Sequence, residues 1–334
     1  MGGHMPLHVT AGLGGNRGPC AAASPDGSRV YVGGGDGALH AVSPGGRKLW
    51  ATNLREQVMS PLATADGVYC LVQGEGDGAS KLCALAPDGT VRWSEPIDGG
   101  ASQFLVPAGE LVLVTTGDTA KGTVRAYAPD GAVRWETKTL TGPSSEPVVS
   151  GGVAYIGTSE LEALDIKRGH RLWSTSFDGG GAGRPAPLGG MVVVEGGARG
   201  ADLHGVSLGG KKQWNTDNND TRGDDYRLIP FGTVALSMSA TLQRITALKS
   251  QDGSTAWTFR GDDETPAYSD PVVVGSRAYV CLGLALYVIG TDGKRRQKVY
   301  FGDPQDQHTH SPVVRGNRVY VATAKGIAAI DLPS

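Results

Sequence analysis

The fold is decided by a stretch that reads Arg29-Val-Tyr-Val-Gly-Gly-Gly-Asp-Gly-Ala-Leu-His-Ala-Val-Ser-Pro-Gly-Gly-Arg-Lys-Leu-Trp50. It alternates short apolar runs with clusters of Gly, Asp, Ser and Pro, and a further turn at Ser24-Pro-Asp-Gly27 comes before it. Short apolar or β-branched runs bounded by such residues predict strands joined by tight turns. With the small residues that follow Pro19, the stretch predicts four strands of one small antiparallel sheet.

Tryptophan marks the repeat of this unit along the chain. The residues are Trp50, Trp93, Trp135, Trp173, Trp214 and Trp257, and Tyr300 falls where a seventh is due. Their spacings are 43, 42, 38, 41, 43 and 43 residues. A four-stranded unit with a period in the low forties is typical of a β-propeller blade, because one small sheet must stack on its neighbours to bury its faces.

The number of blades follows from a proline near the start of each copy. These residues are Pro19, Pro61, Pro107, Pro147, Pro187, Pro230, Pro271 and Pro312. The eighth copy ends at Gly326-Ile-Ala-Ala-Ile-Asp331 without a fourth strand. Leu7-His-Val-Thr10 stands where Leu49-Trp-Ala-Thr52 stands in the next copy, so we expect it to complete the last blade. The prediction is an all-β, eight-bladed β-propeller closed by its N-terminal strand.

A family resemblance rests on the fourth copy. Its segments Gly152-Val-Ala-Tyr-Ile-Gly157, Leu161-Glu-Ala-Leu-Asp165 and Arg168-Gly-His-Arg-Leu-Trp173 resemble the repeats of the pyrroloquinoline-quinone-like (PQQ-like) propellers. The resemblance extends from Leu7 to Asp331. It implies that the aromatic residue at each outermost strand docks against the neighbouring blade. The same repeat serves quinoprotein dehydrogenases, outer-membrane assembly lipoproteins and sensor domains, so it does not define one activity.

The cofactor expected from quinoprotein dehydrogenases does not carry over to this chain. Those enzymes are much longer, have adjacent paired cysteines in the quinone pocket and hold calcium with inserted loops. Here the four cysteines are separate, and the repeats have almost no insertions. We therefore predict that the chain belongs to the non-quinoprotein branch of these propellers and binds neither PQQ nor another cofactor. Calcium or another metal is the minor alternative.

Composition and charge restrict the partners. A net charge of -2 without a basic run argues against a nucleic-acid partner. The sequence contains no run of 18 apolar residues, so no membrane span is predicted. A closed ring is one domain, so we expect residues 6–334 to form a single propeller. We also expect the protein to be a monomer. Residues 1–5 have the character of a tag remnant and cloning junction, which leaves a cell-envelope or a cytoplasmic location open.

Two of the four cysteines are expected to face each other. Cys70 and Cys83 fall on the second and third strands of the second copy, on either side of a turn near residues 76–77. A cross-strand disulfide has unfavourable geometry in this position, so we expect both thiols to stay reduced.

The functional site is expected at one end of the central channel, where each outer strand connects to the next inner strand. Ring closure turns equivalent positions toward one axis, and the polar connections would then form a funnel. Acid and base groups for an enzyme would be Glu146, Asp225, Asp270, His308 and His310. Ligand-binding groups would be Arg17, Arg184, Arg227, Tyr268 and Gln103.

No metal site is predicted in this funnel. His308-Thr-His310 offers two imidazoles on one side of an extended segment, but hydrogen bonds that fix the loop explain them better than a metal with no assigned third ligand. The acidic loop 217–225 resembles a calcium loop in charge only, because Arg222 and Leu228 occupy positions that an EF-hand gives to Gly and Glu.

Three functions are compatible with the sequence. The first is a sensor or binding module that takes a small polar or anionic molecule, or a protein partner, at the funnel. The second is an enzyme that performs acid–base chemistry there on a polar or anionic substrate. The third is a protein–protein scaffold.

Overall fold

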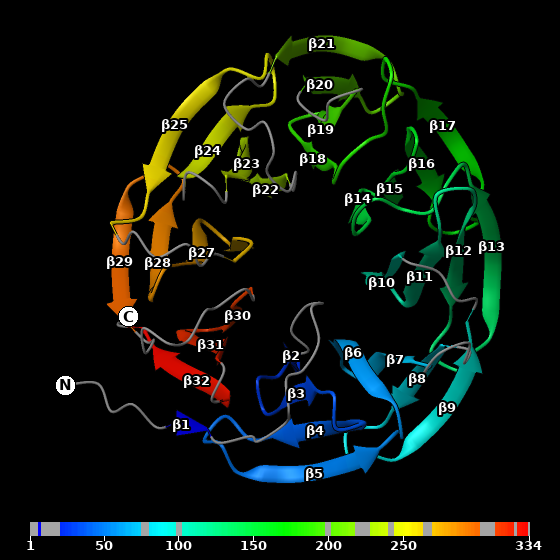
Figure 1. Ribbon diagram of the computed structural model, residues 1–334, viewed down its shortest axis with the longest axis vertical. Helices are drawn as coiled ribbons and strands as arrows, with labels where there is room; N and C mark the ends of the chain where they lie inside the picture. Colours follow the sequence, from blue (N-terminus) through cyan, green and yellow to red (C-terminus); the bar gives the residue numbers. More distant parts are fainter. Residues whose placement is uncertain are drawn as a thin grey trace.

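The computed structural model describes residues 6–7, 21–74, 80–97, 102–197, 202–217, 228–239, 244–262, 269–300, 311–323 and 326–332. In these ranges every regular element is a strand, and the strands form eight four-stranded antiparallel sheets. The sheets stand as blades around a central opening (Figure 1). The predicted eight-bladed β-propeller is therefore confirmed.

Each blade runs from an inner strand beside the opening to an outer strand at the rim (Figure 1). The inner strands of blades 1 to 8 are β2 Ala21–Ala23, β6 Gln57–Thr64, β10 Ser102–Ala108, β14 Val148–Ser150, β18 Ala186–Leu188, β22 Ile229–Phe231, β26 Val272–Val274 and β30 Val313–Arg315. The second strands are β3 Val30–Gly33, β7 Gly67–Gln73, β11 Leu111–Gly117, β15 Val153–Gly157, β19 Met191–Gly196, β23 Val234–Ser239, β27 Arg277–Leu282 and β31 Arg318–Thr323.

The third strands are β4 Ala38–Val42, β8 Lys81–Leu85, β12 Gly122–Tyr127, β16 Leu161–Asp165, β20 Asp202–Ser207, β24 Arg244–Lys249, β28 Ala285–Gly290 and β32 Gly326–Asp331. The outer strands are β5 Lys48–Asn53, β9 Val91–Pro96, β13 Val133–Thr139, β17 Arg171–Thr175, β21 Lys212–Asp217, β25 Thr255–Arg260, β29 Arg295–Tyr300 and, in blade 8, β1 Pro6–Leu7. Because consecutive strands are antiparallel, the connections between blades and the loops between second and third strands share one face of the ring. We call it the connection face.

The hydrophobic core lies between the blades. Alternate side chains of a strand point to opposite faces of its sheet, and each face meets the next blade. In blade 5, for example, Val192 and Val194 pack against blade 4, whereas Val193 packs with Ala235 of blade 6. Eight such clusters, one at each junction, make up the core.

Six tryptophans fasten the outer strands of blades 1 to 6 to the blade that follows each of them. Every indole N–H donates to a carbonyl in the turn between the third and outer strands of that blade, at 2.8–3.0 Å. The ring lies on the glycine of that turn: at Gly169, whose φ is 76°, an added Cβ would stand 2.4 Å from the Trp135 ring. The predicted docking role of the tryptophans is thus confirmed.

The prediction that Tyr300 is the seventh docking residue is wrong. Each Trp stands four residues after its own turn glycine and pairs with Ala or Gly on the third strand, as Ala247 pairs with Trp257. In blade 7 the same place is taken by Gln297, which pairs with Val288. Tyr300 is 66% exposed instead. The physical reason is that β32 and β1 of blade 8 are chain ends and not a hairpin, so no turn is present to receive an indole.

The N-terminus closes the ring, although in a different register from the predicted one. Pro6 pairs with Ala328 and Leu7 with Ile327. Ile327 corresponds to Leu39 in blade 1, whose partner is Thr52. Leu7 therefore stands in the place of Thr52, three residues from the expected alignment, and residues 8–10 lie outside the described residues. Both chain ends contribute to one sheet, as predicted.

The cysteines agree with the expected pairing of strands. Cys70 and Cys83 are register partners on β7 and β8, and both are reduced. Within the described part of the chain, no helix is long and apolar enough to cross a membrane.

Candidate functional site

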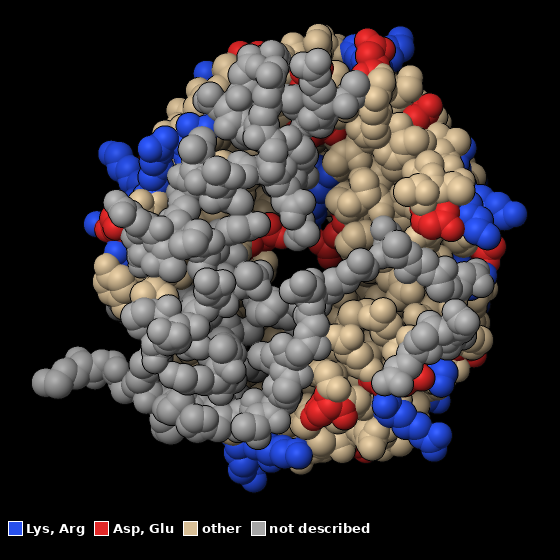
Figure 2. Space-filling model, viewed as in Figure 1, with Lys and Arg blue, Asp and Glu red and all other residues tan. Residues whose placement is uncertain are grey.

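The mouth of the channel on the connection face is the candidate site. Figure 2 looks onto this face, and acidic and basic side chains lie at the edge of the central opening. In Figure 1 the inner strands surround this opening, so the residues just before each inner strand reach it first. Glu146 precedes β14, Arg184 precedes β18 and Asp270 precedes β26. We call this opening the mouth.

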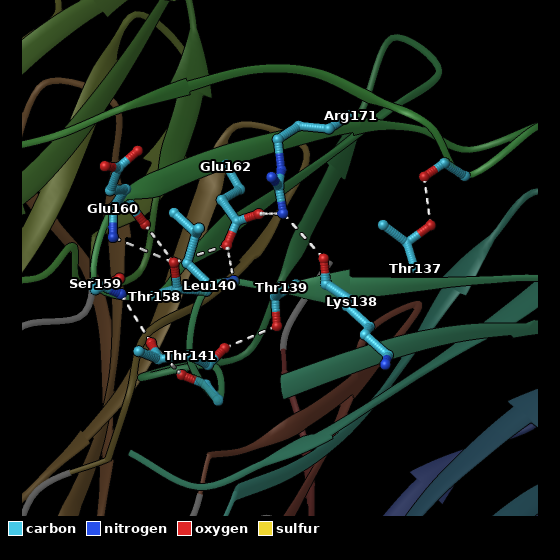
Figure 3. Close-up of polar contacts among 12 residues, drawn as sticks. Thr137, Lys138, Thr139, Leu140, Thr141, Thr158, Ser159, Glu160, Glu162 and Arg171 are labelled. Carbon is cyan, nitrogen blue, oxygen red and sulfur yellow. Dashed lines mark hydrogen bonds and ion pairs between the residues drawn. The ribbon is translucent and has the colours of Figure 1, made fainter. Parts of the chain in front are cut away.

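A buried carboxylate fixes the start of the connection between blades 3 and 4. Glu162 on β16 is fully buried, and its Oε1 accepts hydrogen bonds from the Leu140 amide and the Thr158 hydroxyl, both at 2.9 Å. Arg171 approaches the other oxygen, Oε2, to 2.6 Å. Figure 3 shows these groups converging, with Glu162 on β16, Arg171 on β17, and Thr158 and Leu140 just after β15 and β13. Since a buried charge must be paired, the network holds the connection at Leu140 in place.

The next part of the same connection is tied to blade 5. The Ser144 amide donates to the Gly157 carbonyl at 2.8 Å, and the Ser144 hydroxyl donates to the Ala182 carbonyl. Gly157 permits this approach because a Cβ there would stand 2.2 Å from the Gly183 carbonyl oxygen. Two successive connections are therefore bonded to each other, and they carry Glu146 and Arg184.

Glu146 and Arg184 form an ion pair across the junction of blades 4 and 5. Arg184 Nη2 donates to Glu146 Oε2 at 2.9 Å, and the side chains are 21% and 46% exposed. Arg184 Nε is shielded from solvent and has no hydrogen-bond partner among the described residues. A guanidinium has five N–H donors in a planar fork, and the pair with Glu146 uses the donor at Nη2.

Two further predicted residues lie apart from this pair. Gln103 on β10 points into the junction with blade 2, where its Nε2 donates to the Ser80 hydroxyl at 3.2 Å. Asp270 is partly buried at the start of blade 7, and its carbonyl accepts a bond from the Ser269 hydroxyl at 3.3 Å. Gln103 therefore helps to join two blades, and Asp270 stays at the rim of the mouth.

The other predicted site residues are Arg17, Asp225, Arg227, Tyr268, His308 and His310, and they lie outside the described residues. Their roles as ligand-binding or acid–base groups stay predictions. Among the residues that the structure does describe, no group of three or more His, Cys, Asp and Glu side chains is arranged to hold a metal ion.

Glu195, a buried acid near the connection face, is not among the predicted site residues. It is the second-last residue of β19 in blade 5, is 2% exposed, and finds no hydrogen bond for either carboxyl oxygen within the described part of the chain. Burial raises its pKa to about 8, and the nearby Ser237 hydroxyl on blade 6 only moderates this shift. The carboxyl is therefore mostly neutral at pH 7. A glutamate that follows Val-Val-Val in a strand offers a weak signal, because its burial depends on the facing blade.

A histidine–aspartate pair was missed as well. His40 on β4 lies at 2.8 Å from Asp36, through Nε2 and Oδ2, and the histidine is almost fully buried. Asp36 belongs to the loop between the second and third strands of blade 1, so the pair lies on the connection face. Its spacing of four residues across a turn is visible in the sequence, although the contact itself requires the turn geometry.

Comparisons with known proteins agree with this architecture. A family model described as "Outer membrane protein assembly factor BamB" matches residues 8–120 and 120–237. No curated protein matches the sequence.

Among solved structures, the chain is similar to BamB from Moraxella catarrhalis, with 16% identity, a TM-score of 0.68 and 94% of each chain covered. It is also similar to the computationally designed Ika8 protein, with 14% identity, a TM-score of 0.71, and 96% of this chain and 99% of that one covered. Sqt1 of Saccharomyces cerevisiae matches with 12% identity, a TM-score of 0.70, and 99% of this chain and 98% of that one covered. At these identities the structures show the fold alone.

Proposed function

This chain belongs to the family described as outer membrane protein assembly factor BamB, and we propose that it is a protein-binding module whose contact surface is the mouth. The family description names an assembly factor, which is a role carried out by contacts with other proteins. The fold supports a binding or scaffold role because a closed ring presents many loops on one rigid face.

The observation that carries the proposal is the ion pair between Glu146 and Arg184. Its two side chains come from successive blades, and the bond from the Ser144 hydroxyl to the Ala182 carbonyl holds their connections together. Arginine is among the residues enriched at the energetic centres of protein interfaces. A carboxylate or carbonyl group of a partner would bond the N–H groups that Glu146 leaves open, at little cost in ordering the loops.

A small polar or anionic molecule is the other occupant compatible with the sequence. Arg184 would recognise its charged group in the same way, but a small ligand needs a concave pocket that buries most of its surface. The described residues supply an exposed carboxylate and a partly exposed arginine at the mouth, which suits a partner with a surface of its own.

The experiment compares charge reversal at the mouth with charge reversal elsewhere. Arg125 and Glu136 form the matched control, because they pair at 2.6 Å with 24% and 41% exposure on β12 and β13, away from the opening. Immobilised wild type, Arg184→Glu and Arg125→Glu are incubated with extract of the organism that carries the gene, and retained proteins are quantified by mass spectrometry.

We expect at least one protein to be retained by wild type and Arg125→Glu and to be lost roughly tenfold with Arg184→Glu, as for an interface arginine worth about 1.4 kcal/mol. Equal retention by the two variants would contradict the mouth as the contact surface. A metabolite screen by thermal shift on the same proteins distinguishes the small-ligand alternative, which would raise Tm in wild type and not in Arg184→Glu.

A further inference from the structure

Two reduced cysteines face each other inside the ring, away from the mouth. Cys70 on β7 and Cys83 on β8 are direct register partners, and they are 0% and 3% exposed. Both belong to the apolar cluster that joins blades 1 and 2, so they project from the same face of their sheet. Neither takes part in the proposed contact surface.

The register determines how far apart the two residues are. The Ile97 amide donates to the Ser80 carbonyl, so Ser80 and every second residue after it turn their backbone bonding groups toward β9. Cys83 is out of phase with Ser80 and bonds to β7, which makes it a hydrogen-bonded partner of Cys70. Such partners have Cα atoms about 5.5 Å apart, which lies within the range of disulfides. Their Cβ atoms, at about 5.5 Å, must approach by about 1 Å for a bond to form.

The contacts of the two sulfur atoms favour reaction at Cys83. A hydrogen bond from Cys70 lowers the pKa of Cys83 to about 7 against the opposing effect of burial, and Cys83 Sγ also lies 3.5 Å from the Ser94 hydroxyl oxygen. Thiolates, and not thiols, are the nucleophiles in oxidation. Cys281 provides the contrast, since burial raises its pKa to about 12.

We propose that Cys70 and Cys83 are a reversible redox pair that a peroxide converts to a cross-strand disulfide. The Cys83 thiolate attacks one peroxide oxygen, the O–O bond breaks, and hydroxide leaves and is protonated to water. The resulting sulfenic acid is attacked by Cys70, the S–O bond breaks, and a second water forms with the proton that Cys70 releases. In sum, two thiols and one peroxide give one disulfide and two waters.

The register also predicts that this bond is easily reversed. A disulfide that requires two strands to draw together is more readily reduced than one at the preferred spacing. Because both thiols are buried, the oxidant reaches them only when blade 2 opens locally, so the reaction is slow and follows the opening of that blade. Its product lies in the junction between blades 1 and 2 and not at the surface.

The test uses the folded full-length protein treated with hydrogen peroxide, then alkylated in denaturant and mapped by mass spectrometry. We expect two of the four cysteines to escape alkylation, one cross-linked peptide that joins residues 70 and 83, and full recovery of the thiols with dithiothreitol. Cys281→Ser is the matched control and should form the same cross-link. Circular dichroism checks that each variant is folded.

Cys70→Ser separates the steps, because Cys83 should then stop at the sulfenic acid and be trapped by dimedone. Alkylation of residues 70 and 83 to the same extent as Cys281 would overturn the proposal. Conversion of Cys83 to sulfonic acid in wild type, without a cross-link, would overturn it as well.

Discussion

The contact between Trp135 and Gly169 gives the sharpest prediction about stability, through the substitution Gly169→Ala. Gly169 lies in the turn between β16 and β17 with φ of 76°, and an added Cβ would meet Cδ2 and Cε3 of Trp135 at 2.4 Å. The indole cannot move away cheaply, because it is 9% exposed and its Nε1 donates to the Ile166 carbonyl at 2.9 Å. The methyl group must therefore displace the turn or the ring.

Two costs add up for this substitution. A left-handed backbone costs a residue with a Cβ about 1–2 kcal/mol, and overpacking a core contact costs about 1–3 kcal/mol. Gly152→Ala is the matched control: its φ is 82°, it lies in the same blade, and its Cβ would meet nothing within 4 Å. We expect Gly169→Ala to lower the free energy of unfolding by about 1–3 kcal/mol more than Gly152→Ala does.

Urea unfolding followed by far-UV circular dichroism measures both variants, in wild type and in a Trp135→Ala background. Without the indole, the two glycine substitutions should cost the same, because only the backbone term remains. Equal costs in wild type, or an excess for Gly169→Ala that survives removal of Trp135, would refute the docking argument.

Three further predictions concern the core, a buried acid and the cofactor. Trp135→Ala should lower the free energy of unfolding by about 3–5 kcal/mol, since it removes a buried aromatic, and a loss below about 1 kcal/mol in urea unfolding would contradict this. The pKa of Glu195 is about 8 in the folded protein against an ordinary value of 4.5, so the stability that its neutral form provides is present below pH 4.5 and is lost as the pH rises through about 8. The free energy of unfolding in urea should thus fall from pH 5 to pH 8 by up to about 4 kcal/mol more in wild type than in Glu195→Gln, whereas parallel profiles would show that Glu195 is not the cause. Finally, we expect no stoichiometric PQQ and no quinone-dependent dehydrogenase activity, and a quinone absorbance band that titrates to one equivalent would disprove that.

The repeat in the sequence was enough to predict the blades, because each blade is specified locally by its turns, apolar runs and tryptophan. The two errors occur where the chain ends interrupt the repeat. Spacing between aromatic residues suggested Tyr300, while the distance from the turn glycine leads to Gln297. The alignment of Leu7 was based on a short segment without a turn glycine, so nothing in the sequence fixed its register.

The candidate site was predictable in outline only. Topology places Glu146 and Arg184 at one end of the ring, and the structure adds their ion pair. Gln103 differs because alternate side chains of β10 face blade 2, so its direction depends on strand register and not on its place in the connection. Glu195 was not predictable, because its burial comes from the neighbouring blade.

Site-specific photocrosslinking tests the proposed contact surface most directly. A benzophenone amino acid is placed at Glu146, at the mouth, or at Glu110, an exposed residue in the turn between β10 and β11 on the opposite face of the ring. Both proteins are irradiated with the same native extract. Binding at the mouth predicts a partner crosslinked from position 146 and absent from position 110. A partner crosslinked from position 110, or equally from both positions, would contradict it.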